Sequence, residues 1–251
     1  MPDTRHRLKS PNQNRIAMWS GPRNLSTALM YAFAARGDAV VWDEPFYAAY
    51  LEATGIDHPM RDAIIDDNET DTDRIASICK GPIPQGKSVF YQKHMTLHMV
   101  KGFDRRWMRS CQNVFLIRHP ARVVASYAKK REGATLADIG FVQQVELYED
   151  VLGWSGSRPL IIDSDDIRAN PEGCLRKLCT ALGLSFTRNM LHWPAGGNEA
   201  DGTWAPHWYA AVHRSTGFEG AEGPLPALGG AYAELAAQAL PFYQQLSEFK
   251  L

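Results

Sequence analysis

The chain has 251 residues, of which 45% are hydrophobic and 22% charged, a composition typical of a soluble protein with one large or two smaller α/β domains. Its formal net charge of −1 argues against binding nucleic acid or a membrane through a broad basic surface, so an anionic ligand would need a few well-placed cations. The four cysteines form no Cys-x-x-Cys pair, and no stretch approaches the ~18 apolar residues of a membrane span, so we expect a cytoplasmic protein with reduced thiols. Residues 1–14 are polar, lack the apolar centre of a signal peptide, and are predicted to form a disordered tail.

The first predicted strand, at residues 15–19, leads into the most informative segment of the chain. A loop with the sequence Gly21-Pro22-Arg23-Asn24-Leu25 precedes a helix that opens with Ser26-Thr27. Such a layout directs backbone N–H groups and a helix N-terminus at one point, which favours binding of a phosphate or sulfate. Aligned with the nucleotide-binding pattern G-x-x-x-x-G-K-[ST], Gly21 fits, but Ser26, Thr27 and Ala28 stand where Gly, Lys and Ser/Thr belong. We therefore predict an anion site that uses Arg23 as its cation and needs no metal.

The remaining elements alternate between short apolar strands and amphipathic helices. Further strands are predicted at residues 39–42, 88–93, 113–118 and 160–163. Helices are predicted over residues 26–35, from Pro120, over residues 136–152, from Pro171 to Leu182, and over residues 231–249 with a kink at Pro241. Residues 57–86 are predicted to be a surface excursion with one short helix near residues 74–79, and residues 194–230 an irregular segment or lid. This alternation predicts an α/β fold with a central parallel sheet covered on both faces, and a ligand site at the carboxyl ends of the strands.

A second polar constellation lies at the end of the fourth predicted strand. Arg118 closes that strand, Pro120 begins a helix, and Ser126 lies two turns into it on the side that faces back toward the loop. A planar guanidinium together with a hydroxyl suits a phosphate monoester.

With these two motifs in place, the chain resembles the sulfotransferases that use 3′-phosphoadenosine 5′-phosphosulfate (PAPS). Their first motif, Pro-[Arg/Lys]-Ser-Gly-Thr-Thr, binds the 5′-phosphosulfate and is similar to residues 22–27. Their second, Arg-x-Pro-x-x-x-x-x-Ser, binds the 3′-phosphate and has the spacing of Arg118, Pro120 and Ser126. A third stretch, Tyr-Glu-Asp-Leu with a following Leu-rich helix, is similar to residues 164–184. The resemblance spans about residues 15–190 and implies a three-layer P-loop NTPase-like fold, with residues 15–251 as a single domain.

The chain also departs from the family pattern in two places. Asn24-Leu25 replaces Ser-Gly in the first motif, and the C-terminal Arg-Lys-Gly element of the cytosolic members is only echoed by residues 213–217, which makes Arg214 a candidate 3′-phosphate ligand. The residues that the resemblance assigns to the donor are Gly21, Pro22, Arg23, Asn24, Leu25, Ser26, Thr27, Arg118, Ser126 and Arg214.

Sulfuryl transfer also needs a base for the proton of the acceptor. Glu44 follows the second predicted strand and enters the same cleft, and several sulfotransferase branches keep a glutamate base at about this distance from the first loop. The rival base is His94, because Lys93-His94 resembles the Lys-Thr-His segment of the cytosolic branch. Lys93 is a candidate to bridge the leaving oxygen with either base.

The resemblance implies an enzyme that transfers a sulfuryl group from PAPS to a hydroxyl or amine of a small molecule, with no nucleic-acid or membrane partner and a possible homodimer. Two alternatives remain open. One is an ATP-dependent small-molecule kinase, although the altered lysine and Ser/Thr positions disfavour it. The other is a non-catalytic protein of the same fold that binds a nucleotide. The sequence does not identify the acceptor, because acceptor pockets are formed by loops.

Overall fold

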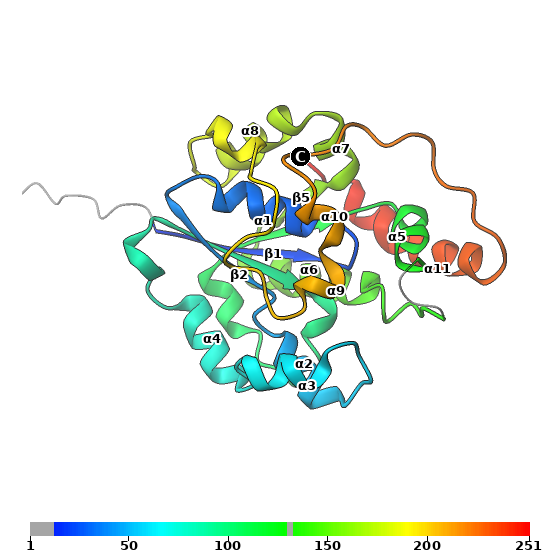
Figure 1. Ribbon diagram of the computed structural model, residues 1–251, viewed down its shortest axis with the longest axis horizontal. Coiled ribbons are helices and arrows are strands. Elements are labelled where there is room, and N and C mark those ends of the chain that lie inside the picture. Colours follow the sequence, from blue (N-terminus) through cyan, green and yellow to red (C-terminus); the bar gives the residue numbers. More distant parts are fainter. Residues whose placement is uncertain (1–12, 130–132) are drawn as a thin grey trace, which may run out of the picture.

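A five-stranded parallel sheet forms the centre of the computed structural model, which describes residues 13–129 and 133–251 (Figure 1). The strand order is β2-β3-β1-β4-β5, and every neighbouring pair is parallel. The strands are β1 (Asn14–Ser20), β2 (Ala39–Asp43), β3 (Val89–Met95), β4 (Gln112–Ile117) and β5 (Leu160–Asp163). β1 begins at the last residue of the predicted tail, while residues 1–12 of that tail lie outside the described residues. All five predicted strands are thus found within two residues of their expected bounds.

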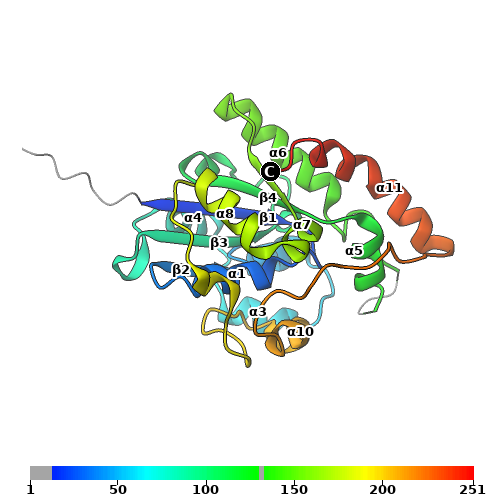
Figure 2. The same ribbon diagram turned by 90° about the horizontal axis from the view of Figure 1, so that it is seen from above.

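Successive side chains of β1 enter two different hydrophobic cores, because neighbouring residues of a strand point to opposite faces. Ile16 and Met18 pack with helices α1 (Ser26–Ala34) and α8 (Pro171–Ala181). Ala17 and Trp19 pack with α4 (Thr72–Lys80), α6 (Phe141–Ser155) and α11 (Gly230–Ser247). Figure 2 shows α6 and α11 lying together on their side of the sheet. The predicted three-layer α/β fold with a covered parallel sheet is therefore confirmed.

The segments that connect the strands contain more helices than the sequence predicted. The predicted excursion at residues 57–86 contains two α-helices rather than one, and the helix predicted from residue 136 begins five residues later. Pro241 lies inside α11, which continues past it. The other α-helices are α2 (Tyr47–Thr54), α3 (Arg61–Asp67), α5 (Pro120–Tyr127), α7 (Ser164–Ala169), α9 (Ala205–Trp208) and α10 (Ala210–His213). Short 3₁₀ turns lie at η1 (Pro84–Gly86), η2 (Thr96–His98), η3 (Arg106–Ser110) and η4 (Arg188–Leu191).

The carboxyl end of β1 packs directly on the start of α6. A Cβ atom at Gly21 would lie 2.6 Å from the carbonyl oxygen of Ile139, so this position requires glycine. From α6, the Gln144 amide donates hydrogen bonds to the carbonyl oxygens of Trp19 at 3.4 Å and Leu116 at 2.9 Å. The loop after β1 is thereby held between the sheet and α6.

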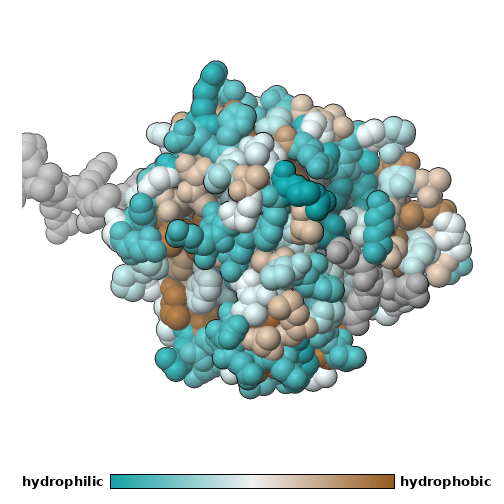
Figure 3. Space-filling model, viewed as in Figure 1, coloured by the Kyte–Doolittle hydropathy of each residue, from teal (hydrophilic) through white to brown (hydrophobic). Residues whose placement is uncertain are grey.

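Hydrophilic residues predominate on the face shown in Figure 3, and hydrophobic residues are scattered across it. Among the described residues, the exposed large hydrophobic side chains are Met60, Ile78, Leu225, Phe249 and Leu251. Over residues 13–129 and 133–251, no helix combines the length and the apolar character needed to cross a membrane.

A buried ion-pair network joins the carboxyl ends of β2 and β3. The sheet register places Asp43 opposite Lys93, whose Nζ lies 2.8 Å from Asp43 Oδ1, and both side chains are 1% exposed. The same Nζ forms an ion pair with Glu44. Burial opposes the charge on Lys93, but the two carboxylates outweigh it and raise the pKa of the ammonium group. One buried cation therefore compensates two carboxylates, an arrangement in which losing one partner is costly.

We expect Lys93→Met to lower the free energy of unfolding by about 3–5 kcal/mol in urea denaturation at pH 7, because it leaves Asp43 and Glu44 buried side by side without a cation. The uncompensated pair would bind protons more tightly in the folded than in the unfolded state, so the deficit should shrink as the pH falls. Lys87→Met is the control, because Lys87 is only half-buried and donates to a carbonyl; its effect should stay within about 0.5 kcal/mol. Equal losses in the two variants, or a deficit independent of pH, would contradict this account.

Candidate functional site

A pocket of about 620 Å³ opens at the carboxyl edge of the sheet. Its walls come from the loop after β1, the ends of β2, β3 and β4, the helices α5 and α7, and the segment that follows α10. The residues proposed from sequence that line it are Pro22, Arg23, Asn24, Leu25, Ser26, Thr27, Glu44, Lys93, Arg118 and Ser126. The pocket therefore brings together ten of the thirteen candidate residues, and Gly21, His94 and Arg214 are not in its lining.

The loop between β1 and α1 adopts a conformation that is unusual for its side chains. Arg23 and Leu25 both have left-handed backbones, with φ values of 63° and 69°, at a cost of roughly 1–2 kcal/mol each. Asn24 between them is buried; its Nδ2 donates to the carbonyl of Leu116 at 3.2 Å. The hydroxyl of Ser164 donates to the Asn24 carbonyl at 2.7 Å. Leu25 thus takes the conformation that glycine adopts freely, and Asn24 ties the loop to β4 and the start of α7.

The two phosphate motifs meet at Arg23. Its Nε donates to Ser126 Oγ at 2.9 Å, and its carbonyl accepts a 2.5 Å hydrogen bond from Arg118. Burial, reinforced by the nearby charge of Arg118, lowers the pKa of Arg23, but an arginine stays protonated at neutral pH. Leu25 at the N-cap of α1 has no polar side chain to cap the helix, so the first N–H groups of α1 are left for an anion. Positive charge and backbone donors therefore converge on this end of the pocket.

Glu44 supplies a buried carboxylate to the same pocket. It follows β2 with a φ of 39°, its N–H donates to the Lys93 carbonyl at 2.9 Å, and it is 8% exposed. Burial raises the pKa of its carboxyl group; the Lys93 ammonium works against that rise, and Asp43 adds to it. A carboxylate whose pKa is moved toward neutrality is suited to accept a proton near physiological pH.

Lys93 is fully engaged in holding these acids. Its ammonium group donates to Asp43, to Glu44 and, at 2.9 Å, to the hydroxyl of Tyr209. An ammonium group has three N–H donors, so none is left for a leaving oxygen in this conformation. The Lys93 ammonium, predicted to bridge a leaving oxygen, thus contacts Asp43, Glu44 and Tyr209 in this structure.

The structure does not bring His94 to the pocket. Because Lys93 and His94 are consecutive residues of β3, they point to opposite faces of the sheet. The His94 ring stacks on Trp19 with 4.5 Å between ring centroids, and a ring nitrogen lies 3.2 Å from the side-chain oxygen of Gln92. Burial, with a smaller effect of Lys93, lowers the pKa of His94 to about 3. His94 is therefore a neutral residue of the core around Trp19, which corrects its interpretation as a rival base.

His98 is a pocket residue that sequence reasoning missed. Its ring lies between those of Tyr47 and Tyr50, with centroids 4.4 and 4.9 Å away, and its Nδ1 is 3.9 Å from Glu44 Oε2. This buried nitrogen has no hydrogen-bond partner among the described residues. The only signal in the sequence was its spacing of four from His94, which suggests a metal, whereas the chain turns at η2 and separates the two rings. Within the described residues, no cluster of three or more His, Cys, Asp and Glu side chains is placed to hold a metal ion.

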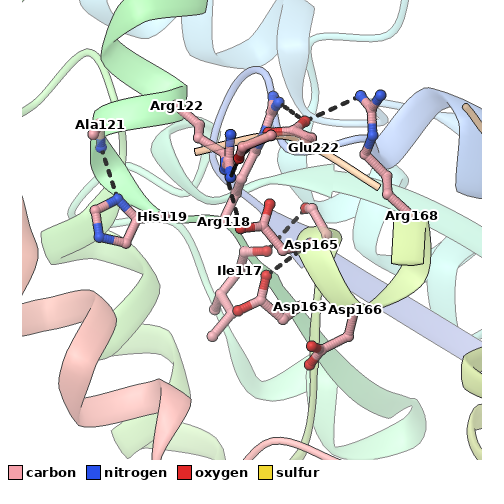
Figure 4. Close-up of polar contacts among 12 residues, drawn as sticks. Ile117, Arg118, His119, Ala121, Arg122, Asp163, Asp165, Asp166, Arg168 and Glu222 are labelled. Atoms are coloured by element: carbon pink, nitrogen blue, oxygen red, sulfur yellow. Dashed lines mark hydrogen bonds and ion pairs between the residues drawn. The ribbon is translucent and has the colours of Figure 1, made fainter. Parts of the chain in front are cut away.

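Arg214 is not among the lining residues either and is exposed at the end of α10, between the lining residues Val212 and Ser215. The cations beside Arg118 are instead Arg122 from α5 and Arg168 from α7, both of which line the pocket. Figure 4 shows that the three arginines surround the carboxylate of Glu222. No motif marks Arg122, Arg168 or Glu222, because their contacts join residues between 54 and 104 positions apart.

Comparisons with known proteins identify relatives of the chain. A family model described as a sulfotransferase domain matches residues 14–249. Two Arabidopsis thaliana proteins, branched-chain-amino-acid aminotransferase-like proteins 2 and 1, are each 37% identical to the chain over 92% of its length. The match covers 41% of each of these proteins, so the chain spans about two-fifths of their length.

Two solved structures share the fold at low sequence identity. A sulfotransferase from Alicyclobacillus acidocaldarius superposes with a TM-score of 0.58 at 12% identity, over 95% of this chain and 97% of that one. The sulfotransferase domain of the Synechococcus PCC 7002 olefin synthase gives a TM-score of 0.52 at 16% identity, over 92% and 96% of the two chains. The family match across nearly the whole chain shows that the protein belongs to the sulfotransferase family.

Proposed function

We propose that the protein transfers a sulfuryl group from PAPS to a hydroxyl or amine of a small molecule. One observation carries the proposal: a single pocket joins two cationic anion sites, at Arg23 and at Arg118, to the buried carboxylate of Glu44. PAPS has two phosphate-bearing positions, and the pocket offers two arginines, Arg23 and Arg118, from different segments of the chain to bind them. The pocket volume of about 620 Å³ also lies within the range of small-molecule and cofactor sites.

The chain's own residues divide into three roles. Arg23, Ser26, Thr27 and the N-terminus of α1 would bind the phosphate that carries the sulfuryl group and stabilise its charge as it leaves. Arg118 would bind the 3′-phosphate. PAPS supplies an activated sulfuryl group on a phosphate leaving group. Glu44 would accept the proton of the acceptor hydroxyl or amine, with Lys93 holding its carboxylate in place.

The side of the pocket near Glu44 is aromatic. Tyr47, Tyr50, His98 and Trp208 line it, and the first three rings form one stack. Such a wall supports an acceptor with a flat ring, which the rings would contact while Glu44 faces its nucleophilic atom.

We expect Arg118→Ala to weaken binding of adenosine 3′,5′-bisphosphate about 10- to 100-fold, the loss typical of a hydrogen bond to a charged group. Calorimetric titration without magnesium measures this directly. Arg109→Ala is the matched control, because Arg109 is exposed on η3 and stacks on Trp154 outside the pocket. If the wild-type protein instead bound only magnesium-ATP, the kinase alternative would be supported. Nucleotide binding without turnover of any acceptor would support the non-catalytic alternative.

Glu44→Gln should lower the turnover number by about 10²–10⁴-fold, the range for loss of a general base. Binding of adenosine 3′,5′-bisphosphate should change little, because glutamine keeps the size of the side chain. Turnover is followed as bisphosphate released from PAPS in the presence of a panel of alcohols, phenols and amines. Glu52→Gln, on the exposed side of α2, serves as the control. Normal turnover in Glu44→Gln together with loss of turnover in His94→Ala would return the base to His94.

The pH dependence of turnover should respond to Asp43. A base acts when deprotonated, so turnover rises with pH through the pKa of Glu44, and Asp43 raises that pKa. Asp43→Asn removes this like charge, and Lys93 then pairs with Glu44 as its one remaining carboxylate partner. The pKa of Glu44 should fall, so the acidic limb of the profile should move to lower pH. Asp66→Asn, exposed on α3, should leave the limb in place. A shift to higher pH, or none, would argue against Glu44 as the titrating base.

A further inference from the structure

A short segment of the chain lies across the arginines at one end of the pocket. This segment, residues 219–224, is called the strap; it belongs to the stretch that runs from α10 past α7 to α11, drawn in orange in Figure 1. Glu222 of the strap is held by Arg118, by Arg122 Nε at 2.9 Å and by Arg168 NH1 at 3.0 Å. Its side chain is only 10% exposed. A single carboxylate therefore serves three guanidinium groups (Figure 4).

Every other contact between the strap and these arginines also uses an acceptor of the strap. The carbonyl of Gly220 accepts from Arg168 Nε at 3.0 Å, and the carbonyl of Gly223 accepts from Arg122 at 2.6 Å. Glu219, at the exposed end of the strap, lies 2.8 Å from Arg168 NH2. The strap has no helix or strand of its own, so lifting it breaks few backbone hydrogen bonds. The strap therefore contacts the arginines as an anionic ligand would, through acceptor oxygens, while it remains part of the chain.

The charges left behind match a phosphate monoester. With the strap away, the carboxylate still paired with these arginines among the described residues is Asp165, 3.1 Å from Arg122 Nε, so these four side chains together carry a net charge of +2. A phosphate monoester carries about −1.5 to −2 charges at pH 7 and three acceptor oxygens, whereas Glu222 offers one charge and two oxygens. Arg118 Nε is buried without a partner among the described residues and supplies a further donor.

We propose that Arg118, Arg122 and Arg168 form a binding subsite for a terminal phosphate monoester, and that Glu222 occupies this subsite until the phosphate displaces it. The proposal rests on the proposed function for the identity of that group, the 3′-phosphate of the donor. Opening the strap then costs free energy, and only a ligand that carries this phosphate offsets that cost by binding the three arginines. A strap closed in about nine molecules of ten would weaken the apparent affinity of such a ligand about 10-fold.

The first test uses inorganic phosphate and does not depend on the donor. Glu222→Gln should show a larger rise of melting temperature with phosphate than the wild-type protein, since its three arginines lack their carboxylate. Adding Arg168→Ala to Glu222→Gln should abolish that gain. Glu234→Gln is the control, because it makes the same charge change at an exposed position of α11 outside the pocket lining, and it should respond to phosphate as the wild type does. Should Glu222→Gln fail to fold, Glu222→Asp keeps the charge with a shorter reach and should give an intermediate gain.

The second test compares two nucleotides by calorimetry. Glu222→Gln should bind adenosine 3′,5′-bisphosphate about 10-fold more tightly than the wild type. Its affinity for adenosine 5′-phosphate, which lacks the 3′-phosphate, should be unchanged.

The outcomes separate the two proposals. A phosphate gain in Glu222→Gln without binding of either nucleotide would support the subsite and refute PAPS as the donor. No phosphate gain in either Glu222 variant, or equal gains for the two nucleotides, would overturn the subsite whatever the donor is.

Discussion

Parallel pairing of β1 with both β3 and β4 is the constraint on which the site depends. Because the strands run in the same direction, the loops that follow them emerge at one edge of the sheet. The loop after β1 brings Arg23, the end of β3 brings Lys93, and the end of β4 brings Arg118. Both faces of β1 are covered by cores, so these polar side chains gather at that edge. The arrangement of the strands thus creates the pocket before any ligand is bound.

Backbone strain is concentrated at this edge. Among the described residues, five non-glycine residues have positive φ values, and three of them, Arg23, Leu25 and Glu44, line the pocket. Each such residue costs of the order of 1–3 kcal/mol and persists only where its surroundings hold it. Asn24 and Ser164 supply hydrogen bonds on one side of the pocket, and the Lys93 network supplies them on the other. The strain is therefore balanced by buried polar contacts, and the same contacts fix the direction of the functional side chains.

More of the fold than of the site could be predicted from the sequence. Short apolar runs identified all five strands, and spacing identified Arg23, Glu44 and Arg118 as pocket residues. Strand alternation already implies that Lys93 and His94 face opposite ways, but which of them faces the pocket depends on the helices that cover each face. The three-arginine subsite could not be predicted, because Arg168 and Glu222 meet through tertiary structure alone. Likewise, Leu25 has a left-handed backbone of the kind that glycine adopts, and its residue type gives no signal of that conformation.

Glu222 affects both the stability of the ligand-free protein and its affinity for an anion. Three guanidinium groups gathered at one place repel each other when no ligand is present, and this repulsion destabilises the folded state. A carboxylate from the chain itself relieves that repulsion. The same carboxylate must compete with any ligand for the arginines, since whatever stabilises the free state reduces the free energy gained on binding. A phosphate, with more charge and more acceptor oxygens than a carboxylate, displaces Glu222 from the arginines, whereas a neutral ligand does not. In this way the charge that stabilises the free protein also selects the ligand that replaces it.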